Sequence, residues 1–360
     1  MINFSLWSGD QRLPDLLLKM NTFYKEIIVK ILTISVAAYN VEKTLDKTLN
    51  SFNIPELYDD LEVLVVDDGS KDRTKDIAKK YEKLAPKTFR YVGKENGGHG
   101  STINKGISLA TGKYFKVIDG DDWVDSNVLV KFVNKLKTID TDMVLTNHVE
   151  VYPDHINKVS LVKGLDEGKK YTWNDNFDIK RVILHTLTVK TELLKKNHVH
   201  ITENCFYVDI EYVVWATYVS KSITYLNLYL YMYRLGNGEQ SVSKKNMLKN
   251  IDMQAKVSYQ LVRLYSKFSK SNDMEQNQDN TIFNTFKRSI GSTMRTYLLM
   301  NSKEAKRNIV EFDKNISNIS SLSFKRLNDD KFIHLIRLNN YMMIPVIRQM
   351  YKLWVLRYDK

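Results

Sequence analysis

The run Tyr114-Phe115-Lys116-Val117-Ile118-Asp119-Gly120-Asp121-Asp122-Trp123 decides the fold class of this 360-residue chain. Its apolar part is typical of a short strand buried on both faces, and it ends in three carboxylates around one glycine. Open α/β sheets bind ligands beyond the carboxyl ends of their strands, so this turn is a candidate site. A divalent cation with oxygen ligands would offset the repulsion between the carboxylates. The alternative interpretation is a solvated acidic turn.

Strand-like and helix-like segments alternate on both sides of this run. Further strands are predicted at residues 30–37, 61–66, 89–92 and 143–146, and amphipathic segments separate the strands along the chain. Asn40 and Ser70 are predicted to cap the helices after the first two strands. This alternation favours right-handed β-α-β units, and hence an α/β fold with a mostly parallel sheet flanked by helices.

The composition limits the class of protein. A hydrophobic fraction of 43% is that of a globular protein, and the length suffices for one large domain with an appendage or for two domains. Cys205 is the only cysteine, which excludes an internal disulfide and fits a reducing compartment. No apolar stretch reaches the roughly 18 residues that span a bilayer, and the N-terminus lacks the form of a signal peptide. We therefore expect a cytoplasmic protein.

The basic excess lies entirely in the C-terminal third. Residues 241–360 carry 22 Lys and Arg against 10 Asp and Glu, whereas the first 240 residues carry 32 of each. We predict three regions: an N-terminal extension (1–29), an α/β domain (30–240) and a basic helical C-terminal module (241–360). Such a charge asymmetry favours contact between the module and an anionic surface.

The last helical segment of the module has apolar side chains at helical spacing with basic residues among them. The apolar positions are Ile344, Ile347, Tyr351, Trp354 and Val355. Such a helix suits the headgroup level of a membrane, and it equally suits packing on the α/β domain with a solvated basic face. No recognised nucleic-acid motif accompanies the charge, so nucleic acid is not expected as a partner.

Two acidic turns follow predicted parallel strands, one at Asp67-Asp68 and the other at residues 119–122. Because parallel strands end at the same edge of a sheet, we expect Asp68 and Asp121 to face one cleft. A cation at one turn would neutralise a diphosphate and Asp68 would accept hydrogen bonds from a base or sugar, which suits a nucleotide-linked substrate. Turn chemistry and helix capping are the alternative explanation. A dinucleotide-binding fold needs glycines directly after the first strand, and residues 37–40 contain none.

Five short motifs, taken in order, resemble those of family-2 glycosyltransferases with the GT-A fold. They are Ile34-Ser35-Val36-Ala37-Ala38-Tyr39-Asn40, Val65-Val66-Asp67-Asp68-Gly69-Ser70-Lys71-Asp72-Arg73-Thr74, Asn96-Gly97-Gly98, Asn104-Lys105-Gly106 and Asp119-Gly120-Asp121-Asp122. The resemblance covers roughly residues 30–150. It implies inverting transfer from a nucleotide-sugar donor, most often a UDP-sugar, with Mn²⁺ or Mg²⁺. Residues 30–150 would then bind the donor, and residues 151–240 would form the acceptor side.

The resemblance assigns roles to individual positions. Asp121 would be the direct metal ligand, and Asp119 would contact the ribose or the metal shell. The positions implied to bind the nucleotide sugar are Ala37, Tyr39, Asp68, Gly97, Gly98, Asn104, Asp119, Gly120 and Arg234. An arginine that the family commonly has before Asn104 is absent, and His99 and Lys105 are candidates to replace it. Arg234 would pair with the diphosphate, although it equally suits a structural role on an aromatic strand.

Inverting transfer needs a base that takes the proton of the acceptor hydroxyl. The family usually places this carboxylate in a Glu-Asp pair that opens a helix, and the matching position here is Asp209. Because Val208 replaces the usual glutamate, Glu211 and Asp122 remain alternatives. A carboxylate that only stabilises the helix N-terminus is the structural alternative.

The predicted activity is metal-dependent, inverting transfer of a sugar from a nucleotide diphosphate to an acceptor hydroxyl, such as that of a lipid-linked glycan of an exopolysaccharide or wall polymer. The basic module would then rest on the inner face of the plasma membrane. Two other classes remain open. A sugar nucleotidyltransferase would need a basic glycine-rich loop near the first strand, which this sequence lacks. A non-catalytic scaffold would bind the nucleotide sugar without turnover.

Overall fold

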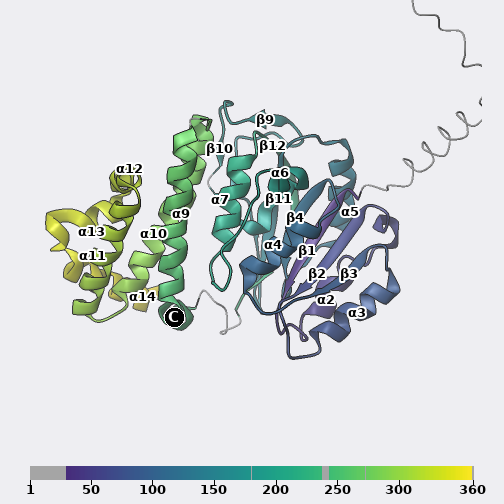
Figure 1. Ribbon diagram of the computed structural model, residues 1–360, viewed down its shortest axis with the longest axis horizontal. Helices are drawn as coiled ribbons and strands as arrows, with labels where there is room; N and C mark the ends of the chain where they lie inside the picture. The colour runs from purple at the N-terminus through teal and green to yellow at the C-terminus, as the bar shows by residue number, and fades with distance from the viewer. Residues whose placement is uncertain (1–29, 180, 237–242, 272, 359–360) are drawn as a thin grey trace, which may run out of the picture.

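The computed structural model describes residues 30–179, 181–236, 243–271 and 273–358 (Figure 1). A layered α/β part, purple to teal, lies at one end of the molecule, and a helical part, green to yellow, lies at the other. The predicted N-terminal extension, residues 1–29, falls outside the described residues.

Alternating strands and helices make up the α/β part, as the sequence predicted. The strands are β1 (Leu32–Ala38), β2 (Leu61–Asp67), β3 (Phe89–Gly93), β4 (Tyr114–Asp119), β5 (Trp123–Val124), β6 (Met143–Val151), β7 (Ile156–Val159), β8 (Val162–Lys163), β9 (Lys170–Thr172), β10 (Asp178–Ile179), β11 (Leu187–Lys190) and β12 (Ser222–Arg234). The helices are α2 (Leu45–Asn50), η1 (Pro55–Leu57), α3 (Thr74–Leu84), α4 (His99–Leu109), α5 (Ser126–Thr138), η2 (Leu184–Thr186), α6 (Thr191–Lys196) and α7 (Asp209–Val219).

The C-terminal region is helical, again as predicted. Its elements are α8 (Lys244–Lys249), α9 (Ile251–Ser271), α10 (Gln276–Leu298), α11 (Ser302–Ile319), α12 (Ser321–Arg326), η3 (Leu327–Asp329), α13 (Lys331–Tyr341) and α14 (Ile344–Tyr358).

The main sheet has the strand order β3-β2-β1-β4-β11-β6-β12-β5. Strands β3, β2, β1 and β4 are parallel, and β11 then pairs antiparallel with both β4 and β6. Chain order runs outward from β1 to β3 on one side and resumes at β4 on the other, so the direction of winding reverses between β1 and β4. Such a reversal opens a crevice at the carboxyl ends of the strands. In the register of this pair, Ala37 stands opposite Asp119.

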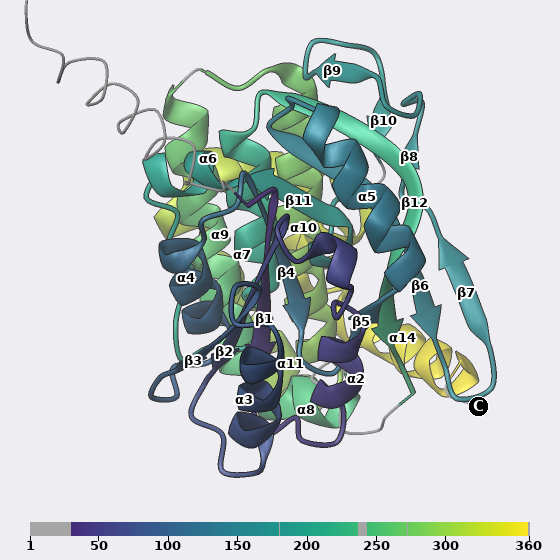
Figure 2. The same cartoon turned by 90° about the vertical axis from the view of Figure 1, so that its right-hand side faces the viewer.

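Side chains of the central strand β4 alternate between two apolar layers, as the two-residue period of a strand requires. Tyr114 and Ile118 belong to a cluster shared with α2, α3 and α5, which lie on the side of the sheet that Figure 2 shows. Phe115 and Val117 belong to a second cluster shared with α4, α6 and α7. Burial on both faces explains why this strand reads as a continuous apolar run.

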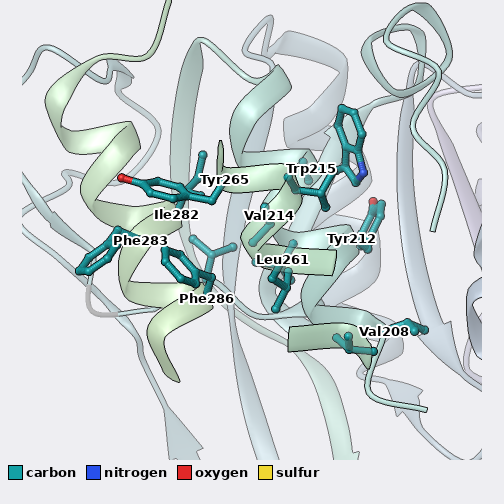
Figure 3. Packing of buried hydrophobic residues seen from close by; sticks show 14 of the residues in the cluster. Val208, Tyr212, Val214, Trp215, Leu261, Tyr265, Ile282, Phe283 and Phe286 are labelled. Carbon is teal, nitrogen blue, oxygen red and sulfur yellow. The ribbon is translucent and has the colours of Figure 1, made fainter. Parts of the chain in front are cut away.

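Helix α7 is packed between the sheet and the C-terminal helices (Figure 3). The ring of Trp215 on α7 lies 5.0 Å from that of Phe268 on α9, and Tyr265 lies 4.8 Å from Phe286 on α10, measured between centroids. The predicted boundary near residue 240 falls among residues 237–242, which the structure does not describe. Apolar packing nevertheless joins residues on both sides of that point into one cluster.

The two predicted helix caps are wrong. Asn40 has a φ of 52°, and its side-chain oxygen accepts a hydrogen bond from the backbone N of Lys71 at 2.8 Å. The hydroxyl of Ser70 accepts one from the backbone N of Asn40 at 2.9 Å. The N-cap positions are instead Thr44 and Arg73. The polar side chains of these turns therefore join the ends of β1 and β2 to each other. Helix α2 begins five residues after Asn40, and α3 begins four residues after Ser70.

A buried amide holds the C-terminus of α7. Gln278 of α10 is fully buried, and its Nε2 donates to the carbonyls of Thr217, Tyr218 and Ser220 at 2.9, 2.8 and 3.1 Å. The last carbonyls of a helix have no partner within the helix, so an outside donor must satisfy them when they are buried. Gln278 is that donor.

Replacing Gln278 with Leu should destabilise the fold by about 1–3 kcal/mol, because the carbonyls of Thr217 and Tyr218 then lose their donor, whereas that of Ser220 keeps the Trp173 indole. Chemical denaturation monitored by circular dichroism measures the change. The matched control is Gln276→Leu, an exposed position in the same first turn of α10, which should change the free energy of unfolding by less than about 0.5 kcal/mol. Equal stability of the two variants would contradict the capping role.

Candidate active site

A cleft of about 700 Å³ lies at the carboxyl ends of β1 and β4. It is formed by the loops after these strands, by β6 and the segments that follow β7 and β10, by the N-terminus of α4, and by the entry to α7. The predicted site residues that line it are Ala37, Tyr39, Asp119, Gly120, Asp121 and Asp209. The crevice expected at the reversal of the strand order therefore contains the acidic turn and the predicted base.

The three carboxylates of the acidic turn occupy different environments. Asp121 is exposed and lines the cleft, whereas Asp122 is buried and is not among the lining residues. The Asp122 carboxylate accepts a hydrogen bond from the Tyr231 hydroxyl and another from the backbone N of Arg234, both at 2.7 Å. Burial, followed by repulsion from Asp119 and Asp121, raises the pKa of Asp122 well above its ordinary value. Asp122 therefore ties the turn to β12, and Asp119 and Asp121 remain available to a ligand.

Asp119 forms an ion pair with a histidine at the start of α4. His99 Nε2 lies 3.0 Å from Asp119 Oδ1. Although burial disfavours both charges, the contact with Asp119 raises the pKa of His99, and the contact with His99 lowers the pKa of Asp119. This pair keeps Asp119 ionised inside a protein-walled cleft. Burial followed by repulsion from Asp119 raises the pKa of Asp121, and the charges of Arg234 and His99 oppose that rise.

The predicted base, Asp209, is the first residue of α7. It is open to water within the cleft, yet protein atoms surround it on most sides, and this desolvation raises its pKa. The positive field of His99 opposes that shift, and Arg181 contributes to the same effect. Of the alternatives, Glu211 is fully buried and accepts a hydrogen bond from the backbone N of Thr202 at 3.0 Å. Neither Glu211 nor Asp122 lines the cleft.

Asp68 holds the glycine loop in place. Its two carboxylate oxygens accept hydrogen bonds from the backbone N of Gly97 and Gly98, at 2.9 and 2.8 Å, and from the ammonium of Lys94 at 2.6 Å. The side chain is 4% exposed and does not line the cleft. Asp68 and Asp121 thus follow β2 and β4, the two strands that flank β1, at the same edge of the sheet, but they do not share the cleft. The predicted contact between Asp68 and a nucleotide base stays a prediction.

Four further predicted donor contacts lie outside the cleft lining, namely Gly97, Gly98, Asn104 and Arg234. Asn104 bonds through its side chain to Ile201, donating to the carbonyl at 2.9 Å and accepting from the N–H at 2.8 Å. The Arg234 guanidinium lies 5.0 Å from the centre of the Trp123 ring, and its Nε donates to the carbonyl of Asp121 at 2.9 Å. Asn104 therefore anchors the loop before α7, and Arg234 supports the acidic turn from behind.

The chain offers a cluster suited to a divalent cation among its described residues. Ligand atoms of Asp119, Asp122 and His185 all lie within 4.8 Å of one another. Burial lowers the pKa of His185 to about 3, so its imidazole is neutral, which is the form that binds metals. Carboxylates with one imidazole suit Mn²⁺, and carboxylates alone suit Mg²⁺. Asp119 belongs both to this cluster and to the ligand pair predicted from the sequence, whereas Asp121 belongs only to the latter.

Several residues that line the cleft were missed by the sequence analysis. They are Val41, His148, Glu150, Val159, Leu161, Arg181, Ile183, Leu184, His185, Phe206, Tyr207 and Tyr233. Most come from residues 148–207, where no strand-helix period marks the chain. They reach the cleft because η2 and β11 place a middle segment of the chain between β4 and β6. Sequence distance therefore gave no sign of their proximity to Asp119.

Comparisons with known proteins identify the domain. A family model described as Glycosyl transferase family 2 matches residues 33–197. The chain is 29% identical over 221 residues to the putative glycosyltransferase EpsH of Bacillus subtilis, covering 56% of this chain and 59% of EpsH. It is 25% identical over 226 residues to the cholesterol galactosyltransferase of Borreliella burgdorferi, covering 59% of this chain and 62% of that protein. The chain thus spans less than two thirds of the length of these curated relatives.

Solved structures match the fold at greater coverage. Residues 1–349 of S. aureus TarS, crystallised in complex with UDP-GlcNAc, match with a TM-score of 0.53 and 20% identity, covering 84% of this chain and 92% of that one. At this identity the likeness concerns the fold, and the fold it shares is the GT-A fold. Residues 33–197 of this chain are therefore a domain of glycosyltransferase family 2, built on the GT-A fold.

Proposed function

We propose that the protein transfers a sugar from a nucleotide diphosphate, preferentially a UDP-sugar, to an acceptor hydroxyl in exopolysaccharide or cell-wall glycan synthesis. The observation that carries this proposal is the shared cleft of Asp119, Asp121 and Asp209. One end of that cleft offers carboxylates for a cation and a diphosphate, and the other offers a carboxylate that can accept a proton. The family of the domain and the UDP-GlcNAc complex of TarS support the donor class.

Each group in the cleft has a chemical task in this reaction. The divalent cation would be held by Asp119, either together with Asp121 or together with Asp122 and His185. Its positive charge would stabilise the departing diphosphate. Asp209 accepts the proton of the acceptor hydroxyl while the oxygen of that hydroxyl forms a bond to the anomeric carbon. The bond from that carbon to the diphosphate breaks on the opposite face, so the anomeric configuration inverts. His99 keeps Asp119 ionised throughout.

The two rival classes differ from this proposal in testable ways. A sugar nucleotidyltransferase needs a glycine-rich basic loop after the first strand, and the turn after β1 is Tyr39-Asn40. A non-catalytic scaffold would bind UDP and metal normally but release no UDP from any of UDP-glucose, UDP-galactose and UDP-GlcNAc. Donor hydrolysis assayed with and without Mn²⁺ therefore separates the enzyme from the scaffold.

Asp121→Ala should lower Mn²⁺-dependent UDP affinity by at least about 100-fold, because loss of outer-shell contacts alone costs about 10–100-fold. Isothermal titration with and without Mn²⁺ measures it. Asp59→Ala, at an exposed turn on the opposite edge of the sheet, is the control and should bind like the wild type. If His185→Ala abolishes the metal dependence and Asp121→Ala preserves it, the ion is held by Asp119, Asp122 and His185 instead.

Asp209→Asn should reduce donor hydrolysis by about 10²–10⁴-fold while UDP affinity is unchanged, since an amide cannot accept the proton. A carboxylate acts as a base only when it is ionised, and the pKa of Asp209 is raised by burial. The wild-type rate should therefore increase with pH through a value above the ordinary 3.8 of aspartate. The Glu211→Gln variant should show the same increase of the rate with pH. If the rise of the rate with pH disappears in Glu211→Gln, and Asp209→Asn stays active, the assignment of Asp209 as the base is wrong.

We also propose that the C-terminal helices rest on an anionic membrane surface. No helix among the described residues is long and apolar enough to cross a bilayer. However, α14 and the turn before it expose a row of large apolar side chains, namely Met342, Val346, Met350, Leu353 and Trp354, which are 52–69% exposed. Beside Pro345 lies a hollow on α11 lined by Lys303, Lys306, Arg307 and Lys314. Apolar side chains flanked by cations suit the headgroup level.

The chain should bind vesicles containing phosphatidylglycerol more tightly than vesicles of phosphatidylcholine alone, and salt should weaken the difference. Cosedimentation measures the binding. Met350→Glu combined with Leu353→Glu should abolish it, because two charges then replace exposed apolar side chains. Leu84→Glu, at a 57% exposed position on α3, should bind normally. A wild-type dimer that the double variant dissociates would mean that this face binds a second copy instead.

A further inference from the structure

The loop before α7 presents two aromatic side chains to the cleft. Phe206 is 47% exposed, Tyr207 is half-buried beside it, and their ring centroids lie 6.3 Å apart. Both line the same cleft as Asp209, which follows within three residues. Apolar rings held open to water next to a proton-accepting carboxylate need an explanation beyond packing.

The backbone of this loop adopts a rare conformation at an aromatic residue. Tyr207 has a φ of 66° and Asn204 a φ of 54°. Asparagine tolerates left-handed geometry, but for a bulky side chain it is an outlier that persists only where surrounding contacts enforce it. Such outliers concentrate at ligand sites, where the strain aims a side chain. Here the strained residue is one of the two aromatic residues that line the cleft together with Asp209.

Contacts from three directions hold the loop. The backbone N of Asn204 donates to the carbonyl of Gly97 at 2.5 Å, and Asn104 bonds to both backbone groups of Ile201. A Cβ on Gly100 would lie 2.1 Å from the carbonyl oxygen of Thr202, so α4 touches the loop through bare backbone. From the helical part, Asn250 bonds to the Tyr207 hydroxyl. These contacts hold the loop on both sides of Phe206, at Asn204 and at Tyr207.

The rest of the cleft lining combines polar and aliphatic groups. Arg181, Glu150 and His148 offer charged or hydrogen-bonding atoms, and Val159 and Leu161 offer aliphatic surface. Arg181 is close enough to Asp209 for their charges to interact. An aromatic face together with hydrogen-bonding groups at its rim matches a molecule that has an apolar face and a polar edge.

We propose that Phe206 and Tyr207 form a stacking platform for a pyranose ring of the acceptor, with the attacking hydroxyl of that ring directed at Asp209. A pyranose presents C–H bonds on its face and hydroxyls around its edge. The electron-rich face of an aromatic ring attracts the slightly positive C–H hydrogens. Arg181 and Glu150 bind hydroxyls at the edge. This assignment rests on the proposed function and names the class of its acceptor as a sugar ring.

Saturation-transfer difference NMR with the full chain, UDP and MnCl₂ tests the platform. The probes are methyl β-glucopyranoside, methyl β-galactopyranoside and methyl β-N-acetylglucosaminide, with ribitol 5-phosphate as an open-chain comparison. At least one pyranoside should give signals from the hydrogens of one ring face. Phe206→Ala should weaken these signals at least about fivefold, and Phe206→Trp should retain them. Leu84→Ala, at an exposed position on α3, is the matched control and should leave them unchanged.

The outcomes distinguish the platform from the function on which it rests. Pyranoside signals that survive Phe206→Ala would overturn the platform, as would ribitol 5-phosphate binding in the absence of any pyranoside signal. Absence of all four probe signals, with normal UDP binding, would overturn it too. UDP affinity measured by titration should be the same in Phe206→Ala as in the wild type, which excludes misfolding of the variant. A wild-type chain that fails to bind UDP with Mn²⁺ would instead overturn the proposed function itself.

Discussion

The reversal of winding between β1 and β4 is the constraint on which the rest of the structure depends. It leaves an open crevice at the ends of two adjacent parallel strands, and the register places Ala37 beside Asp119 in that crevice. The other residues that line the cleft come from elements that surround Ala37 and Asp119. Helix α4 brings His99 from one side, and the segment before β11 brings His185 from the other.

The charged groups around that crevice shift the pKa values of neighbouring carboxylates in different directions. Asp119 has an imidazolium partner, Asp122 has only neutral donors from β12, and Asp121 faces the cleft. Like charges this close push their pKa values apart unless partners intervene. A ligand that brings positive charge would therefore oppose the rise in the pKa of Asp121 that burial and Asp119 cause. The charges of His99 and Arg181 also act on Asp209, where they oppose the rise in pKa that burial causes.

The order of the first strands and helices could be predicted from the sequence because their apolar periods are local. The acidic turn and the family motifs were found in the same way, and they led to the correct family and fold. What could not be predicted depends on contacts between distant segments. Asn40 and Ser70 have the side chains of helix caps, but hydrogen bonds between the two turns override that preference. Asp68 follows its strand as expected, yet its carboxylate already accepts hydrogen bonds from the backbone N–H groups of Gly97 and Gly98.

The capping of α7 by Gln278 links the two ends of the molecule mechanically. Helix α7 is a rigid rod of 11 residues, roughly 16 Å long at about 1.5 Å per residue. Asp209 sits at its N-terminus, and α10 grips its C-terminus through three hydrogen bonds. A tilt of α10 that preserves these hydrogen bonds must therefore also move the Asp209 carboxylate at the N-terminus of α7. The helical part is consequently coupled through α7 to Asp209, and a force on its outer surface would displace that carboxylate within the cleft.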